Sequence, residues 1–156
     1  MQLLILRHGK AEDYAASGGD KERALVEKGF DQARQAGALI QAAGLLPDLV
    51  LTSPYRRTRE TAETFCQAAG LEAPVAQPWL ASGMRAETAL TELTAFSRFR
   101  RVAIVGHEPD LSGLIEWLLG ANGGSVDVKK GTLVCLELNH TGRRGQLQFL
   151  IPPGII

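Results

Sequence analysis

The stretch Met1-Gln2-Leu3-Leu4-Ile5-Leu6-Arg7-His8-Gly9 is an apolar run that stops abruptly at a basic pair and a glycine. A short run that is apolar on both faces suits a strand buried in the middle of a parallel sheet. The side chains at the carboxyl end of such a strand project into the crevice where open α/β sheets bind ligands. We therefore expect an α/β fold, and we place a candidate site at Arg7 and His8.

Each residue of the Arg7-His8-Gly9 triplet has a property that an anion site can use. The guanidinium of Arg7 is a fixed fork of donors that fits phosphate or carboxylate. The imidazole of His8 can be neutral near pH 7, so one ring nitrogen can attack an electrophile or accept a proton. Gly9 lets the backbone turn and lets a ligand come close.

Two later apolar runs end in the same way as the first. Residues 45–51 predict a second strand that leads into Thr52-Ser53-Pro54, and residues 102–105 predict a third that leads into Gly106-His107-Glu108-Pro109. Parallel strands of one sheet share a carboxyl edge, so these polar clusters should meet the first one there. His107 occupies the strand-end position that His8 occupies in the first strand, and it is the second candidate catalytic histidine.

A helix is expected over residues 54–69, with Ser53 as its N-cap. A helix N-terminus presents free backbone N–H groups and the positive end of the dipole, which favours an anion. Arg57 lies one turn into this helix and is assigned to the same anion. Arg56 and Arg59 are expected to be surface or rim residues.

The remaining pattern completes an alternation of helices and strands. It predicts a loop over residues 10–23 with a short helical turn near 13–16, a helix over 27–43, a short strand over 73–76, a helix over 85–96 and a helix over 110–119. Residues 132–138 and 146–151 predict two strands joined by a turn, in which His140 is an exposed residue.

The three strand-end clusters together resemble the signature of the histidine phosphatase (phosphoglycerate-mutase-like) superfamily. They are Arg7-His8-Gly9, the pattern Ser-Pro-x-x-Arg-x-x-x-Thr-Ala over residues 53–62, and Gly106-His107-Glu108-Pro109. The start of the chain, Arg7-His8-Gly9-Lys10-Ala11-Glu12, is most similar to that of SixA-type phosphohistidine phosphatases. The resemblance implies a single three-layer α/β domain over residues 1–156, with a mostly parallel central sheet flanked by helices.

The resemblance also implies a phosphatase that forms a covalent phosphohistidine at His8, without a metal or a cofactor. Two arginines and two histidines around one anion suit phosphoryl transfer, which needs in-line attack and neutralisation of the equatorial oxygens. The implied catalytic residues are Arg7, His8, Arg57 and His107, and the implied phosphate contacts come from Arg7, Ser53, Arg57 and His107. Thr132 lies where the family often has a small polar residue near the phosphate.

Residues 80–84 contain no carboxylate, although larger relatives carry a proton-donating glutamate in this part of the chain. A phosphate ester usually needs a general acid, whereas phosphohistidine has a good leaving group once its ring is protonated. We therefore expect the substrate to be a histidine-phosphorylated protein, such as a phosphorelay or phosphotransfer component. Glu12, Glu108 and His107 remain open as acids.

Three alternatives stay beside this prediction. A phosphatase of small phosphorylated metabolites would use the same residues together with a hidden acid. A non-catalytic phosphate-binding regulatory module would keep the pocket without turnover, but such a module does not need two histidines. A metal site built from His8, Glu12, His107 and Glu108 is disfavoured because the adjacent arginines would repel a cation.

Composition restricts the class of protein further. The chain has 156 residues, and its 17 basic and 17 acidic residues give a net charge of zero. This balance argues against nucleic acid or an anionic membrane as the main partner. No apolar stretch suits a signal peptide or a membrane span. Cys66 and Cys135 are expected to be buried thiols in a reducing compartment, so we expect a cytoplasmic protein, and we expect it to be a monomer.

Overall fold

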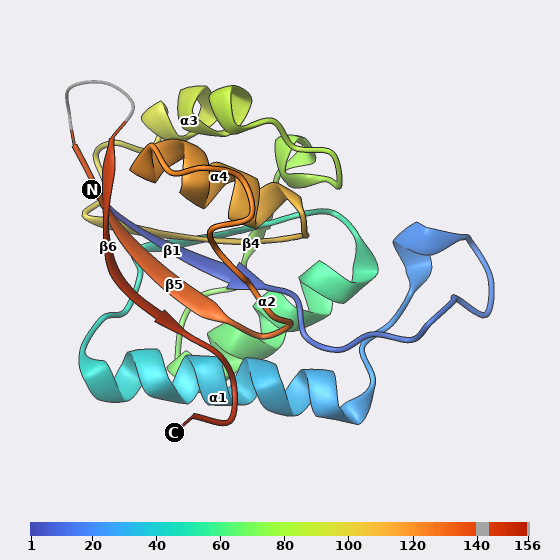
Figure 1. Ribbon diagram of the computed structural model, residues 1–156. Coiled ribbons are helices and arrows are strands. Elements are labelled where there is room, and N and C mark those ends of the chain that lie inside the picture. Colours follow the sequence, from blue (N-terminus) through green and yellow to red (C-terminus); the bar gives the residue numbers. More distant parts are fainter. Residues whose placement is uncertain (140–143, 156) are drawn as a thin grey trace.

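Strands and helices alternate around a six-stranded central sheet (Figure 1). This computed structural model describes residues 1–139 and 144–155. The strands are β1 (Gln2–Arg7), β2 (Leu49–Thr52), β3 (Val75–Ala76), β4 (Arg101–Gly106), β5 (Leu133–Leu138) and β6 (Gly145–Ile151). The helices are α1 (Glu27–Ala43), α2 (Arg56–Ala69), α3 (Ala86–Thr94) and α4 (Asp110–Leu119), with the short 3-10 helices η1 (Asp20–Glu22) and η2 (Pro78–Leu80).

The sheet has the strand order β3-β2-β4-β1-β5-β6. Strand β1 pairs in parallel with β4, and β2 pairs in parallel with both β4 and β3. Strand β5 runs antiparallel to β1, and β6 runs antiparallel to β5. The prediction of a mostly parallel sheet is therefore confirmed, with β5 as the strand of opposite direction.

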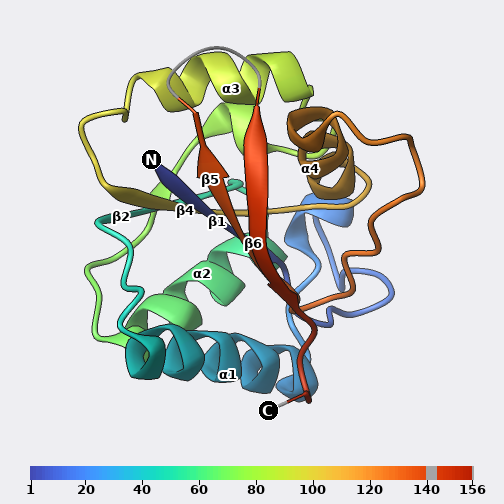
Figure 2. The same cartoon turned by 60° about the vertical axis from the view of Figure 1, so that its left-hand side comes forward.

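The side chains of β1 point alternately to the two faces of the sheet and contribute to the hydrophobic core on each face. Leu3 and Ile5 belong to one hydrophobic cluster with residues of α3 and α4, whereas Leu4 and Leu6 belong to a second with residues of α1 and α2. All four side chains are at most 1% exposed, as expected for a central strand that is covered on both faces. Both ribbon views show α1 and α2 on one side of the sheet and α3 and α4 on the other, which confirms the three-layer fold (Figure 1, Figure 2).

The strand register brings three chain segments to one edge of the sheet. Arg7 of β1 is paired with Gly106 of β4, and Thr52 of β2 is paired with Val105 of β4. The hydrogen bonds continue one residue further, since the His8 N–H donates to the carbonyl of Gly106 at 3.2 Å. The ends of the three strands are therefore level, and the residues that follow them leave the sheet side by side.

Helix α1 has the predicted bounds, but the strand after it starts later than expected. Gly44 ends the helix with a φ of 70°, and the N–H of Leu45 bonds back to the carbonyl of Ile40 at 3.0 Å, as in a Schellman motif. Leu45 is thus part of the helix end. The predicted strand over residues 45–51 is observed only from Leu49, as β2.

The helix after β2 also begins later than predicted. Helix α2 starts at Arg56 with Tyr55 at the N-cap, and the cap has no side-chain hydrogen bond. Ser53 is not the N-cap, because Pro54 and Tyr55 stay outside the helix. Ser53 therefore lies two residues before the N-cap of α2, which is Tyr55. The helical turn expected near residues 13–16 lies instead at η1, after Gly18 and Gly19 turn the chain with φ values of 86° and 75°.

Several other features of the sequence can be located. The turn that contains His140 falls outside the described residues. Cys66 and Cys135 are buried, and burial raises the pKa of Cys66 to about 11 and also raises that of Cys135, so both thiols are unreactive. In the described part of the chain, no helix has the length and apolar character that crossing a membrane requires.

Candidate active site

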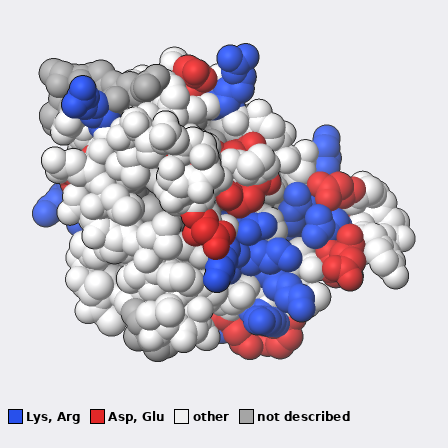
Figure 3. Space-filling model, viewed as in Figure 1, with Lys and Arg blue, Asp and Glu red and all other residues white. Residues whose placement is uncertain are grey.

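The edge of the sheet where β1, β2 and β4 end carries the predicted site residues. His8 is 5% exposed, His107 2% and Arg57 5%, and Ser53 is fully buried. The ring centroids of His8 and His107 lie 5.6 Å apart. On the molecular surface, basic side chains gather on this side of the molecule, near the projecting loop of residues 10–23 (Figure 3). The structure therefore brings together residues that lie up to 100 positions apart, as the strand-end pattern predicted.

The His8 ring is held in one orientation by its own backbone. Its Nδ1 lies 2.8 Å from the carbonyl oxygen of Gly9, and a carbonyl can only accept, so Nδ1 carries the proton and Nε2 has the lone pair. Burial is the main cause that lowers the pKa of His8 to about 3; the positive charges of Arg57 and Arg7 act in the same direction, and the hydrogen bond to Gly9 opposes them. His8 is therefore neutral at physiological pH, with a nucleophilic Nε2.

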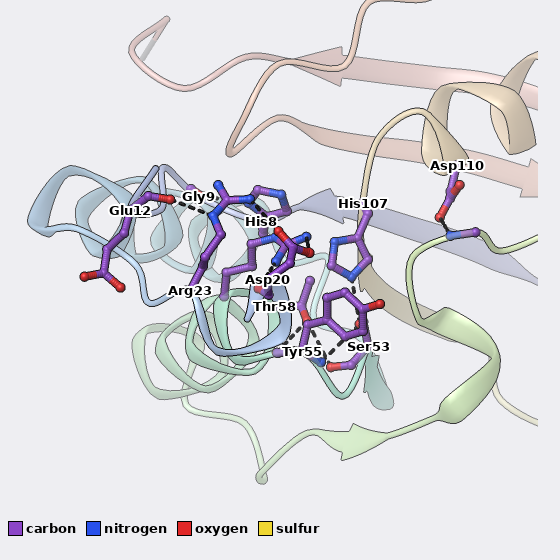
Figure 4. Close-up of polar contacts among 12 residues, drawn as sticks. His8, Gly9, Glu12, Asp20, Arg23, Ser53, Tyr55, Thr58, His107 and Asp110 are labelled. Carbon is purple, nitrogen blue, oxygen red and sulfur yellow. Dashed lines mark hydrogen bonds and ion pairs between the residues drawn. The ribbon is translucent and has the colours of Figure 1, made fainter. Parts of the chain in front are cut away.

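The His107 ring is fixed by Ser53. The Ser53 Oγ accepts a hydrogen bond from the Tyr55 N–H at 3.3 Å and lies 2.8 Å from Nε2 of His107 (Figure 4). The hydroxyl proton is then free to be donated to Nε2, which leaves the proton of the neutral ring on Nδ1. Burial, followed by the charge of Arg57, lowers the pKa of His107 to about 4. Tyr55 packs edge-on against the ring, with centroids 4.8 Å apart.

The two arginines reach the site from different sides. The Nη1 of Arg7 donates to the Val128 carbonyl at 2.9 Å. Arg57 lies over the Tyr55 ring, 5.1 Å from its centroid. The buried polar atoms without a hydrogen-bond partner in the described part of the chain are Nε of Arg7, Nε of Arg57, Nδ1 of His107 and Oγ1 of Thr132. Buried polar groups usually have partners. Each of these four groups can donate a hydrogen bond, and a bound anion could accept from them.

Sequence reasoning missed Asp20, which contacts Arg57 directly. Its carboxylate accepts from Nη2 of Arg57 at 3.2 Å, and its backbone carbonyl accepts from Nη1 at 2.9 Å. Arg23 donates to the other carboxylate oxygen at 3.0 Å and to the Glu12 carbonyl at 2.7 Å (Figure 4). The hydrogen bond from Arg23 and the charge of Arg57 lower the pKa of Asp20. The loop of residues 10–23 thus places an ionised carboxylate at the site.

Gly9 has a structural role that differs from the one predicted. It does not have a positive φ, but a Cβ at Gly9 would lie 2.4 Å from the carbonyl oxygen of Gly29 in α1. The Gly9 N–H donates to Thr61 Oγ1 at 3.1 Å, and that hydroxyl donates to the Arg57 carbonyl at 2.7 Å. Gly9 is therefore required by the close approach of α1. Thr61, the threonine of the Ser-Pro-x-x-Arg-x-x-x-Thr-Ala pattern, links the segment that follows Arg7 to the helix that carries Arg57.

The carboxylates near the histidines have backbone partners. Glu12 accepts from the Ala24 N–H at 2.8 Å, and Glu108 accepts from the Ser112 N–H at 2.7 Å. Asp110 lies apart from the two histidines and accepts from the N–H groups of Gly83 and Met84 (Figure 4). No cluster of three or more metal-ligating side chains occurs among residues 1–139 and 144–155. Glu12 and Glu108 are thus both held by backbone N–H groups.

Fold and site together define an α/β protein with two histidines and two arginines at the carboxyl edge of its sheet. The family model of the histidine phosphatase superfamily (branch 1) matches residues 3–81. An uncharacterised protein of Picosynechococcus sp. (strain PCC 7002) is 32% identical over 140 residues, which are 88% of this chain and 85% of that protein. The chain belongs to the histidine phosphatase superfamily.

Two solved structures share almost the whole fold. The protein histidine phosphatase SixA, complexed with tungstate, superposes with a TM-score of 0.89 at 23% identity and covers 98% of this chain and 97% of its own. A candidate phosphohistidine phosphatase SixA from Agrobacterium tumefaciens superposes with a TM-score of 0.83 at 26% identity. The superposition covers 97% of this chain and 98% of the Agrobacterium chain. The predicted resemblance to SixA-type proteins is confirmed.

The superfamily also contains enzymes with other substrates. The 2,3-bisphosphoglycerate-dependent phosphoglycerate mutase of Corynebacterium diphtheriae is 38% identical over 81 residues, which are 50% of this chain and 33% of the mutase. This chain thus matches about a third of the mutase's length. Membership of the superfamily supports phosphatase activity, and the substrate has to be argued from the site.

The buried neutral histidines make stability depend on pH. Between the pKa values of about 3 and 4 in the folded protein and the ordinary value near 6.5, the unfolded chain binds protons at His8 and His107 that the folded chain does not. The free energy of unfolding should therefore fall as the pH is lowered through this window, by up to about 1.4 kcal/mol per pH unit for each histidine. Urea titrations at a series of pH values measure this slope. The slope should be smaller in His8→Gln and in His107→Gln, and an unchanged slope in both variants would contradict their buried, neutral state.

Asp20 should compete with phosphate for Arg57. In Asp20→Asn the guanidinium loses an ionised partner and the site loses a negative charge, so inorganic phosphate should bind about two- to fivefold more tightly, the range typical of an exposed ion pair. Calorimetric titration with inorganic phosphate measures the change. Glu22→Gln, in the same 3-10 helix, is the matched control, because Glu22 does not bond to Arg57. Weaker binding in Asp20→Asn would mean that Asp20 orients Arg57 instead of competing for it.

Proposed function

We propose that this protein is a phosphohistidine phosphatase that removes the phosphoryl group from a histidine-phosphorylated protein, through a covalent phosphohistidine at His8. The observation that carries the proposal is the bond from His8 Nδ1 to the Gly9 carbonyl. It leaves Nε2 as an unprotonated nucleophile at a site where Arg7, Arg57 and His107 supply hydrogen-bond donors. A site of this kind suits attack on a phosphoryl group.

In the first step, Nε2 of His8 attacks the phosphorus atom in line with the bond to the substrate. The new N–P bond forms as the N–P bond of the substrate breaks, and the substrate histidine leaves with the bonding electron pair. In the second step, water attacks the phosphorus of the His8 adduct as the Nε2–P bond breaks. Nε2 keeps the bonding electron pair, and the phosphate leaves with the oxygen and the protons of the water. His8 then returns to its neutral state, with its proton still on Nδ1 toward Gly9.

The transferring group carries negative charge on its equatorial oxygens, which the donors of the site can stabilise. We assign Arg7, Arg57 and His107 to these oxygens, and Nδ1–H of His107 is the donor that Ser53 fixes. Ser53 was predicted to contact phosphate itself. Because its hydroxyl bonds to His107 and is fully buried, we propose that it acts by positioning that ring.

The carboxylates support a phosphoramidate over a phosphate ester as the substrate. An alkoxide leaving group needs a proton from a general acid. Glu12 and Glu108 accept hydrogen bonds from the backbone, and the lowered pKa of Asp20 keeps it ionised. The lowered pKa of His107 keeps this ring neutral as well. The leaving imidazole of a phosphohistidine, once protonated, departs without such an acid.

The substrate is tested by comparing three phosphoryl donors under the same conditions: a histidine-phosphorylated protein, p-nitrophenyl phosphate and a sugar phosphate. We expect kcat/KM for phosphohistidine to exceed that for the sugar phosphate by about 10²-fold or more. General acid catalysis typically accelerates a reaction by about this factor, and the ester would lack it here. Faster turnover of the sugar phosphate would support a metabolite phosphatase. Phosphate binding without turnover of any donor would support a non-catalytic module.

A further inference from the structure

A groove lined by basic residues opens beside the candidate active site. Its volume is about 810 Å³, and Arg7 of the site is one of its lining residues. Its cationic side chains are those of Arg7, Lys10, Lys28, Lys129 and Lys130, against the two carboxylates of Asp31 and Asp127. Because the whole chain has a net charge of zero, this excess of positive charge is a local feature. Figure 3 shows basic side chains gathered on this side of the molecule.

The lysines come from three separate segments that the fold fixes next to His8. Lys10 follows His8 by two residues, and its N–H donates to Gln32 in α1 at 2.9 Å. Lys28 lies in the first turn of α1. Lys129 and Lys130 precede Gly131, whose N–H donates to the carbonyls of both Arg7 and His8. The positions of these side chains are therefore set by the same backbone that positions the nucleophile.

The four lysines of the groove can bind an anion from outside the protein. None of the four lysines forms an ion pair with another of the described residues, and all four are exposed. Asp31 is instead paired with Arg34. Lys28 also stands at a helix N-terminus, where a positive charge opposes the dipole. Crowded like charges cost stability, and an anion that binds across them offsets this cost.

We propose that this basic groove is the docking surface for an acidic face of the phosphohistidine-bearing protein, which places the phosphoryl group at His8. This proposal rests on the proposed function. A single exposed charge pair contributes little, so a small metabolite with one further anionic group would gain little from four exposed lysines. A protein surface that presents several carboxylates around the phosphohistidine engages them together, which raises the association rate and fixes its orientation.

Two phosphohistidine peptides of equal length test the proposal, one with glutamates around the phosphohistidine and the other with glutamines at the same positions. We expect kcat/KM for the acidic peptide to be about tenfold higher at low salt, mainly through KM, and the difference to vanish near 0.5 M salt, where screening is strong. The double variant Lys129→Glu/Lys130→Glu should remove the preference. It should leave kcat/KM for p-nitrophenyl phosphate within about twofold of wild type, which also shows that the variant is folded.

The matched control is Arg98→Glu/Arg100→Glu, which makes the same change of charge on exposed residues. Arg100 directly precedes β4, and its carbonyl accepts from the N–H of Gln2, the first residue of β1. Arg98 and Arg100 are therefore near the amino ends of these strands, opposite the edge that carries the site. The control should keep the preference for the acidic peptide. Equal turnover of the two peptides by wild type, or an equal loss of preference in both double variants, would overturn the docking proposal and leave the proposed function standing.

Other outcomes separate the docking surface from the reaction. A failure of wild type to hydrolyse either peptide, with p-nitrophenyl phosphate still turned over, would contradict the proposed phosphohistidine substrate itself. A bisphosphorylated sugar that loses more kcat/KM than the acidic peptide in Lys129→Glu/Lys130→Glu would overturn the protein partner and assign the groove to a small polyanion. If Lys129→Glu/Lys130→Glu lost as much kcat/KM with p-nitrophenyl phosphate as with the acidic peptide, the docking proposal would also be overturned. The lysines would then act on the reacting phosphoryl group.

Discussion

The variant His8→Ala is expected to lose turnover by roughly 10⁴-fold or more, the scale seen when a covalent nucleophile is removed. The loss should appear with phosphohistidine and with p-nitrophenyl phosphate alike, since both would be attacked by Nε2 of His8. It should appear in kcat, because Arg7, Arg57 and His107 still surround the phosphoryl group. Steady-state kinetics with the two donors measures the effect.

Binding of inorganic phosphate is the control for the fold of His8→Ala. The donors of the site come from other residues, so the variant should bind phosphate within about tenfold of wild type. Turnover that stays near the wild-type rate in a folded His8→Ala protein would remove the nucleophile from the mechanism. Loss of both turnover and phosphate binding would instead indicate that His8 supports the pocket, and His8→Asn, which keeps a polar side chain, would be measured in its place.

Arg57→Ala is expected to have the second-largest effect, a loss of about 10²- to 10³-fold in kcat/KM. Arg57 is 5% exposed and lowers the pKa of both histidines through its charge, so its guanidinium faces the site. Part of the loss should appear as weaker phosphate binding. Calorimetry with inorganic phosphate, together with kinetics on p-nitrophenyl phosphate, separates the two contributions.

Arg59→Ala is the matched control for Arg57→Ala. Arg59 is on the same helix, but its Nε bonds to the Pro54 carbonyl in an exposed contact. Its removal should change kcat/KM by no more than about threefold, as for other surface charges. Equal losses in Arg57→Ala and Arg59→Ala would mean that the positive charge of the helix as a whole matters, and that no single guanidinium is placed on the phosphoryl group.

The sequence predicted the architecture and the meeting of the site residues because both depend on local patterns. An apolar run followed by His8, and another followed by His107, is enough to place two histidines at one sheet edge once the strands are parallel. The tautomer of His8 also follows from local structure, since the partner of its Nδ1 is the carbonyl of the next residue.

The rest of the site depends on contacts between distant segments, which no local pattern encodes. Asp20 reaches Arg57 across 37 positions because Gly18 and Gly19 redirect the loop. The expectation that Ser53 caps a helix used a correct residue preference, but its hydroxyl bonds to His107, 54 positions away. A polar residue such as Ser53 can be named as a site candidate from the sequence, but the residue that it contacts is known only from the fold.

The measurement that tests the central claim most directly is capture of the phosphorylated protein during the first turnover. Wild type is mixed with a radioactively labelled phosphohistidine peptide and quenched rapidly in alkali, which preserves phosphohistidine, and the labelled residue is then identified by mass spectrometry. We predict an acid-labile phosphoryl group on His8 that forms before phosphate is released and that His8→Ala does not acquire. Release of phosphate with no labelled protein in the first turnover, or a label on any other residue, would contradict the account.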